Sequence, residues 1–189
     1  MREIELFIDL DNTIVNFDKH VIDIMNSELG MNYNWKDNTS WWWEDTGVNK
    51  TYFENLLLRQ NTFLNCEPIK DATEYINILH SEGYNITFIT LPEWNNVYCV
   101  NEKIQWLQRY FDWFDVNKHI VFTKMKHLVS KPNRVLIDDT TSYLDKWDGI
   151  KICKATNCNK DYQGLRCNNW KEIYCLIKLM EEGKYDNKL

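Results

Sequence analysis

The chain opens with an apolar run that ends in two aspartates, Asp9 and Asp11, spaced two residues apart. Alternate residues of a strand point to the same face, so both carboxylates can converge where the strand opens into a loop. Two carboxylates held close together repel each other unless a cation lies between them. The pair predicts a Mg²⁺ site, with one carboxylate as nucleophile and the other as proton shuttle. The competing interpretation is a pair of solvated loop aspartates.

Two further runs end in residues that suit the same chemistry. Residues 134–137 are followed by Asp138 and Asp139, and residues 85–89 are followed by Thr90, whose hydroxyl can donate to a phosphate oxygen. Ligand sites of α/β sheets lie at the carboxyl ends of the strands. Mg²⁺ commonly takes one or two carboxylates together with substrate phosphate. Lys126, ahead of the last acidic run, could offset the charge of the phosphate and of the clustered carboxylates.

These residues resemble the four ordered motifs of the haloacid dehalogenase (HAD) superfamily of phosphotransferases. Residues 9–13 resemble the first motif, DxDx[TV], and Thr90 resembles the second. Lys126 resembles the third motif, and Asp138 with Asp139 resembles the fourth. Single motifs are weak signals, but the ordered set is a strong one.

Within this superfamily, the chain is most similar to the 5'(3')-deoxyribonucleotidases. Phe17 stands at the spacing of that family's base-contacting Phe. Five later segments also resemble family segments: 90–92, 102–111, 121–126, 136–139 and 169–173. The resemblance spans nearly the whole chain and is weakest in residues 30 to 60.

The resemblance implies roles for the motif residues. Asp9 attacks phosphorus, Asp11 carries the proton, and Thr90 and Lys126 offset the phosphate charge. The predicted Mg²⁺ ligands are Asp9, the main-chain carbonyl of Asp11, and the fourth-motif acids Asp138 and Asp139. Of these two acids, Asp139 is favoured as the direct ligand and Asp138 as the partner of Lys126.

The chain departs from the family pattern at several positions. Leu91 stands where the family usually carries a phosphate-binding Ser, and Glu93 and Trp94 follow where it often has a basic residue. The loop before the last acidic run has two extra residues, which leaves Lys131 as an alternative to Lys126. These departures predict a phosphate site or a substrate preference that differs from the family's.

The insertion at residues 17–66 is predicted to be a small helical cap, since HAD families commonly place one there. The catalytic core is then residues 1–16 and 67–189. Three consecutive tryptophans in the insertion cannot share one face of a helix, so at least one is expected to face outward or into the pocket. Six side chains are expected to bind substrate: Phe17, Trp41, Trp42, Trp43, Phe63 and Leu91.

The order of elements predicts an α/β fold. Strand-like runs at 4–8, 86–90, 120–122, 135–138 and 150–153 alternate with helical patterns at 17–29, 52–58, 68–80, 97–110, 143–147 and 170–180. Such alternation is typical of βαβ units and a mainly parallel sheet. The expected architecture is a HAD-like Rossmannoid parallel sheet flanked by helices, with the cap inserted after the first strand.

Composition and charge argue against some binding partners and locations. The chain has 189 residues and a net charge of −6 without a basic block, so a surface that binds nucleic acid is not expected. No apolar run approaches the ~20 residues of a membrane helix, and the start does not resemble a signal peptide. We therefore expect a cytoplasmic protein. The six cysteines contain no CxxC pair, which favours reduced thiols over a zinc site.

The function expected from these features is Mg²⁺-dependent hydrolysis of (deoxy)nucleoside monophosphates. One alternative is a HAD phosphatase acting on a sugar phosphate or a nucleic-acid 3' end. Another is a non-catalytic nucleotide-binding HAD scaffold. The sequence leaves open the preferred base, the position of the phosphate and the oligomeric state.

Overall fold

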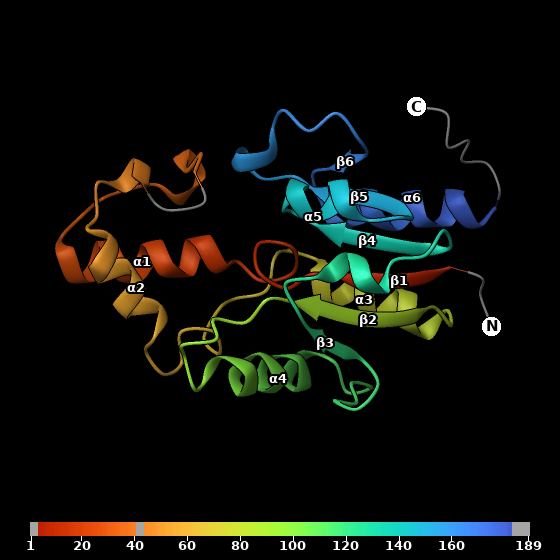
Figure 1. Ribbon diagram of the computed structural model, residues 1–189, viewed down its shortest axis with the longest axis horizontal. Helices are drawn as coiled ribbons and strands as arrows, with labels where there is room; N and C mark the ends of the chain where they lie inside the picture. The colour runs from red at the N-terminus through yellow and green to blue at the C-terminus, as the bar shows by residue number, and fades with distance from the viewer. Residues whose placement is uncertain (1–3, 41–43, 183–189) are drawn as a thin grey trace.

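The computed structural model describes residues 4–40 and 44–182, and its strands form one sheet (Figure 1). The strand order is β3-β2-β1-β4-β5-β6, and every neighbouring pair is parallel. The strands are β1 (Glu5–Ile8), β2 (Asn85–Thr90), β3 (Ile120–Phe122), β4 (Arg134–Asp138), β5 (Ile150–Lys154) and β6 (Arg166–Cys167). The prediction of a parallel α/β sheet is confirmed. The central position of β1 brings the ends of β1, β2 and β4 to one edge.

Helices cover the sheet and extend beyond it. The α-helices are α1 (Phe17–Leu29), α2 (Lys50–Leu57), α3 (Ala72–Ser81), α4 (Cys99–Tyr110), α5 (Thr141–Lys146) and α6 (Trp170–Glu181). Short 3₁₀ helices are η1 (Trp35–Asp37), η2 (Glu44–Thr46), η3 (Lys126–Val129) and η4 (Asn157–Asn159). The helix predicted from residue 68 begins only at Ala72, because Asp71 before it has a left-handed φ of 64°. The two-residue strand β6 is too short to show an apolar pattern.

The two faces of the sheet pack into two different hydrophobic cores. Leu6 and Ile8 of β1 join the larger core with α3, α4 and α6, whereas Phe7 joins the smaller core with α5. Adjacent residues of β2 divide in the same way, with Phe88 in the larger core and Ile89 in the smaller. Neighbouring residues of a strand point to opposite faces of the sheet, so they join different cores. Because helices cover both faces, both sets of side chains are buried, and the strands read as continuous apolar runs.

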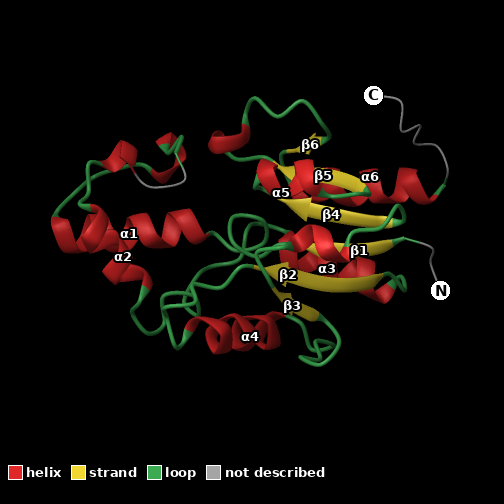
Figure 2. Cartoon of the chain, in the orientation of Figure 1, coloured by secondary structure: helices red, strands yellow, loops and turns green. Residues whose placement is uncertain are grey.

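The helices α1 and α2 form a small unit beyond the ends of the strands (Figure 2). They have a hydrophobic cluster of their own, which contains Val21, Ile22, Met25, Phe53 and Leu56. Helix α1 ends at Gly30, which adopts a left-handed φ of 64° and donates its N–H to the Asn26 carbonyl. This unit lies within the insertion at residues 17–66.

The helices and the cysteines are the subject of two further expectations from the sequence. Across residues 4–40 and 44–182, no helix has both the length and the apolar character needed to cross a bilayer. All six cysteines are free thiols, and four of them are buried: Cys66, Cys99, Cys153 and Cys167.

Candidate active site

The loop that leaves β1 is tightly folded. Asp9 donates its N–H to the Ile137 carbonyl at 2.9 Å, which ties the end of β1 to β4. The carbonyl of Leu10 then accepts from three successive N–H groups, those of residues 13–15. Asn12 takes the left-handed φ of 57° that this turn requires, a conformation that Asn tolerates better than most residues. The turn fixes the directions of Asp9 and Asp11.

Lys126 joins the two acidic strand ends. Its Nζ lies 2.6 Å from Asp9 Oδ1 and 2.6 Å from Asp138 Oδ2, and its side chain is only 1% exposed. Burial opposes the charged form, but the two carboxylates outweigh it and raise the pKa of Lys126 above its usual value. Lys131 is exposed. The structure therefore places Lys126, and not the alternative Lys131, at the strand ends.

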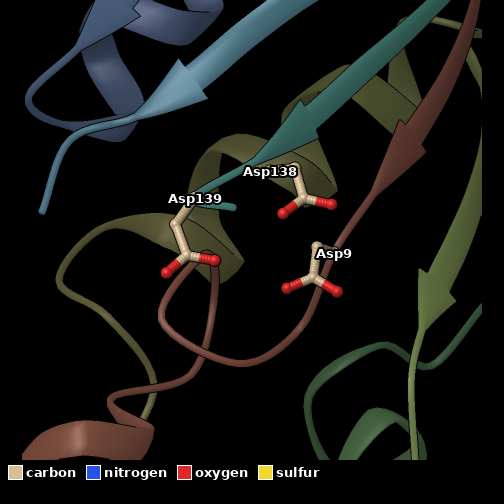
Figure 3. Close-up of side chains that lie close together, drawn as sticks. All are labelled: Asp9, Asp138 and Asp139. Atoms are coloured by element: carbon tan, nitrogen blue, oxygen red, sulfur yellow. The ribbon is translucent and has the colours of Figure 1, made fainter. Parts of the chain in front are cut away.

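Three buried carboxylates converge beside this lysine: Asp9, Asp138 and Asp139 (Figure 3). One oxygen of each lies within 4.8 Å of the others. Asp138 uses both oxygens, since Oδ2 accepts from Lys126 and Oδ1 accepts from the Thr140 N–H at 2.8 Å. Asp139 Oδ2 is buried and has no hydrogen-bond partner among the described residues. This orphaned oxygen and the all-oxygen donor set fit a hard divalent cation such as Mg²⁺.

The electrostatics of the cluster also favour a cation. Burial, together with the charges of Asp138 and Asp11, raises the pKa of Asp9 to about 7, although Lys126 acts in the opposite direction. Burial and the neighbouring Asp138 raise the pKa of Asp139 well above its usual value. The site thus holds more negative charge than its lysines compensate, a deficit that a divalent cation would remove.

Lys103 of α4 is a site residue that the sequence reasoning missed. Its ammonium is ion-paired with the Asp11 carboxylate and donates to Thr90 Oγ1 at 3.1 Å, and its side chain is 2% exposed. Burial opposes its charge, but Asp11 and other nearby groups raise the pKa of Lys103. The family-like segment 102–111 contains this lysine, so the signal was present, but periodicity cannot show that a lysine in the second turn of α4 points toward Asp11.

The neighbouring Glu102 holds the backbone of the segment that carries Phe63. It accepts from the Phe63 N–H at 3.0 Å and also from the Asn61 N–H. The Phe63 ring is stacked on Phe17, with centroids 5.4 Å apart and an interplanar angle of 10°. Phe63 is buried. Its visible role is therefore to support the ring of Phe17.

A pocket of about 580 Å³ opens above the acidic cluster. Its walls come from the strand ends, α1, α2 and the start of α5: Asp9, Asp11, Asn12, Phe17, Asp18, Phe53, Leu57, Thr90, Leu91, Lys126, Asp139, Thr140, Thr141, Ser142 and Tyr143. Of the predicted substrate-binding residues, Phe17 and Leu91 line this pocket. Trp41, Trp42 and Trp43 lie outside the described residues. The apolar part of the wall comes mainly from the α1–α2 unit.

Comparisons with known proteins show which sequences and folds this chain resembles. Residues 2–182 match the sequence family described as 5' nucleotidase, deoxy (pyrimidine), cytosolic type C protein. A relative from Chlorobaculum tepidum, provisionally named a 5'(3')-deoxyribonucleotidase, is 23% identical over 154 residues, covering 75% of this chain and 73% of that protein.

Solved structures of HAD hydrolases share the fold. One is a haloacid dehalogenase-like hydrolase from Streptococcus pneumoniae, with a TM-score of 0.60 and 12% identity over 93% of this chain and 99% of that one. Another is a HAD hydrolase from Bacillus subtilis bound to magnesium, with a TM-score of 0.57 and 14% identity over 94% and 99% of the two chains. At these identities the structures establish the HAD fold alone.

Proposed function

The chain belongs to the cytosolic type C 5'-nucleotidase family, and from this premise we propose that it hydrolyses (deoxy)nucleoside monophosphates to nucleoside and phosphate with Mg²⁺. The observation that carries the proposal is the position of Lys126 between Asp9 and Asp138, at the base of a pocket whose upper wall is apolar. Charged groups below suit a phosphate, and aromatic groups above suit a nucleoside. The α1–α2 unit serves as the cap.

Asp9 is the proposed nucleophile. Its carboxylate forms a bond to phosphorus while the bond from phosphorus to the sugar oxygen breaks, which produces an aspartyl-phosphate and a nucleoside. Lys126 contacts Asp9 directly, so its ammonium offsets negative charge where the phosphate approaches. Asp9 and Asp139 would hold Mg²⁺, with the Asp11 carbonyl as a further ligand. The ion, when bound, supplies Lewis-acid stabilisation of phosphate charge.

Asp11 is the proposed proton carrier. The protonated carboxyl of Asp11 gives its proton to the departing sugar oxygen. The resulting carboxylate, which the Lys103 ammonium stabilises, then takes a proton from the water that hydrolyses the aspartyl-phosphate, and this restores the acid. Lys103 holds the Asp11 carboxylate and the Thr90 hydroxyl together. Lys103 is therefore a positioning residue whose ammonium keeps Asp11 beside the leaving oxygen.

The apolar wall is proposed to receive the nucleobase. Phe17 of α1 and Phe53 and Leu57 of α2 line the pocket. Stacking of a base on an aromatic side chain contributes ~1–3 kcal/mol. This apolar wall supports a nucleotide as the substrate, since a nucleobase needs an apolar surface that a sugar phosphate would not fill.

The first prediction tests the substrate and the metal together. We expect phosphate release from deoxynucleoside monophosphates in Mg²⁺, loss of this activity in EDTA, and recovery when Mg²⁺ is restored. Phosphate release from a panel of nucleotides and sugar phosphates is the measurement. Full activity in chelator would exclude the metal, and a preference for sugar phosphates over every nucleotide would leave only a general phosphatase.

Phe17→Ala tests the proposed base contact when its kcat/KM is measured on nucleotides and on p-nitrophenyl phosphate. Because the ring is proposed to contact the base, its loss should lower kcat/KM for nucleotides by roughly 5- to 150-fold and affect p-nitrophenyl phosphate much less. Equal losses on both substrates would show that Phe17 acts only through its packing on Phe63.

The second prediction concerns Lys103. Lys103→Met should lower kcat/KM for a nucleotide by about 10-fold or more, since a displaced Asp11 forfeits part of the ~10²–10⁴-fold of acid catalysis. The loss for p-nitrophenyl phosphate should be much smaller, because p-nitrophenolate leaves without a proton. The ratio kcat/KM is the right quantity, since it excludes the later hydrolysis of the aspartyl-phosphate.

Lys118→Met, at an exposed lysine paired with Asp115, is the control for loss of one positive charge. If Lys103→Met lowered kcat/KM equally for both leaving groups, Lys103 would not act through Asp11. Partial recovery in Lys103→Arg would support the positioning role.

A further inference from the structure

Within residues 4–40 and 44–182, three lysines are almost completely buried, and one of them differs from the others. Lys103 and Lys126 each contact carboxylates. Lys154, at the end of β5, is 6% exposed, and no carboxylate of the described residues lies within ion-pair distance of its ammonium. Its Nζ donates to the Ala155 carbonyl at 3.1 Å. Burial lowers the pKa of Lys154, and the Asp139 carboxylate opposes this only from beyond ion-pair distance. Buried charges are normally paired, so a buried ammonium without a direct anionic partner among the described residues can accept one.

Lys154 lines a cleft that is distinct from the catalytic pocket. The cleft has a volume of about 360 Å³ and lies between α1 and η1 on one side and the chain after β5 on the other. Four basic side chains line it: Lys19, Lys36, Lys154 and Arg166. Asp18 is the acidic side chain among the residues lining it. The volume is near the lower end of those that hold small molecules.

The charged groups around the cleft are not equally available. Lys19 is paired with Asp23 at 2.8 Å and Glu67 at 3.4 Å. Arg166 donates from Nε and Nη2 to the loop that follows β5. Of the basic residues that line the cleft, Lys154 and the exposed Lys36 are the two lysines whose ammonium groups have no carboxylate partner in the described parts of the chain.

The remaining polar groups are also partly accounted for. Asp18 accepts from the side-chain amides of Asn12 at 2.5 Å and Asn38 at 3.4 Å, which spreads its charge. Asn38 is 3% exposed, and its Oδ1 has no hydrogen-bond partner in the described parts of the chain. The cleft thus offers ammonium donors together with a buried amide acceptor.

We propose that this cleft is a second binding site, separate from the catalytic pocket, for a phosphate group, with Lys154 and Lys36 as its principal cations. A phosphate accepts several charge-assisted hydrogen bonds at once, which matches converging ammonium donors. The buried Asn38 Oδ1 would accept from an O–H or N–H of the same ligand. Free phosphate and the phosphate of a nucleotide share this chemistry.

The cleft joins the cap to the core. The Asn157 side-chain amide donates to the Lys36 carbonyl, and the Cys158 thiol lies 3.6 Å from the Ser40 carbonyl. Asn12 and Asp18 line both this cleft and the catalytic pocket. A phosphate held by Lys36 and Lys154 would tie the same two parts together, next to the loop that carries Asp11.

The test measures binding of inorganic phosphate by calorimetry in the Lys126→Ala background, which disables the catalytic phosphate site. We expect this protein to bind one phosphate, and Lys126→Ala/Lys154→Met to bind none. Lys126→Ala/Lys36→Glu, changed at an exposed position, should bind about tenfold more weakly, because an attraction becomes a repulsion. Lys126→Ala/Lys118→Met is the control and should bind as its parent does.

The outcomes separate clearly. Undiminished binding in both the Lys154→Met and the Lys36→Glu double variants, or no binding in Lys126→Ala alone, would overturn the proposal. Thermal melts show whether each variant is folded, and Lys36→Glu remains decisive if Lys154→Met is not. Competition by a deoxynucleoside monophosphate would identify a nucleotide as the source of the phosphate group, and its failure would identify free phosphate. Because no turnover is measured, these results do not depend on the nucleotidase activity.

Discussion

Asp9→Asn is expected to lower kcat by at least about 10⁴-fold, because an amide oxygen does not attack phosphorus and removal of a catalytic nucleophile has effects of this order. The substitution should leave the fold in place, because Asn has nearly the same shape as Asp. It keeps the backbone hydrogen bond from residue 9 to β4 and leaves an amide oxygen that can accept from Lys126. Steady-state phosphate release and acid-quench trapping of a phosphoryl-enzyme are the measurements. Wild type should show the adduct, and Asp9→Asn should not.

Asp23→Asn is the matched control, since Asp23 lies on α1 with its side chain 53% exposed and forms an ion pair with Lys19 at the surface. It should retain wild-type turnover. A near wild-type rate in Asp9→Asn would refute the covalent route. A slow variant whose adduct persisted would move the nucleophile to another residue of the cluster.

The second large effect is expected at Lys126. Lys126→Ala should lower kcat/KM by about 10²–10³-fold, because removal of one preorganised electrostatic group at a reacting centre typically costs that much. The change also leaves Asp9 and Asp138 without the ammonium that both contact. We therefore expect a lower melting temperature as well, since breaking a buried ion pair leaves an uncompensated charge.

Lys131→Ala is the control for this experiment and should be nearly silent, because Lys131 is exposed. Lys126→Arg separates charge from shape, since it keeps the charge while changing the geometry of the donors. If Lys131→Ala were the more damaging change, the structure-based choice between the two lysines would be wrong.

Asp138 and Asp139 are adjacent acids of one motif, and their contacts in the structure differ. The family resemblance implies a fourth-motif acid as metal ligand, and we favour Asp139 for this role, with Asp138 as the partner of Lys126 or an outer-shell acid. The structure gives a physical reason for the same division. Lys126 and the Thr140 N–H occupy both oxygens of Asp138, whereas Asp139 Oδ2 is buried without a described partner. The assignment of the ligands themselves stays a prediction that metal-binding measurements on the two Asn variants can test.

The sequence by itself determined the parallel α/β class and the order of the motif residues along the chain. It could do so because both signals are local. Apolar runs such as Leu6–Ile8 reflect burial on both faces of a strand, and an acid at the end of such a run is placed at the sheet edge by the strand alone. Most element bounds followed approximately from the same periodicity. The exceptions are short elements such as β6, which had no pattern to show, and the start of α3, which the left-handed Asp71 delays to Ala72.

Only the tertiary structure decided which side chains meet. Lys103 and Asp11 are 92 residues apart, and Lys126 and Asp9 are 117 apart, so neither pairing leaves a trace in local periodicity. The choice of Lys126 over Lys131 depends on how the chain turns through η3 before β4. The isolation of Lys154 is likewise visible only in three dimensions, because the lack of a partner for a buried charge is a property of everything packed around it.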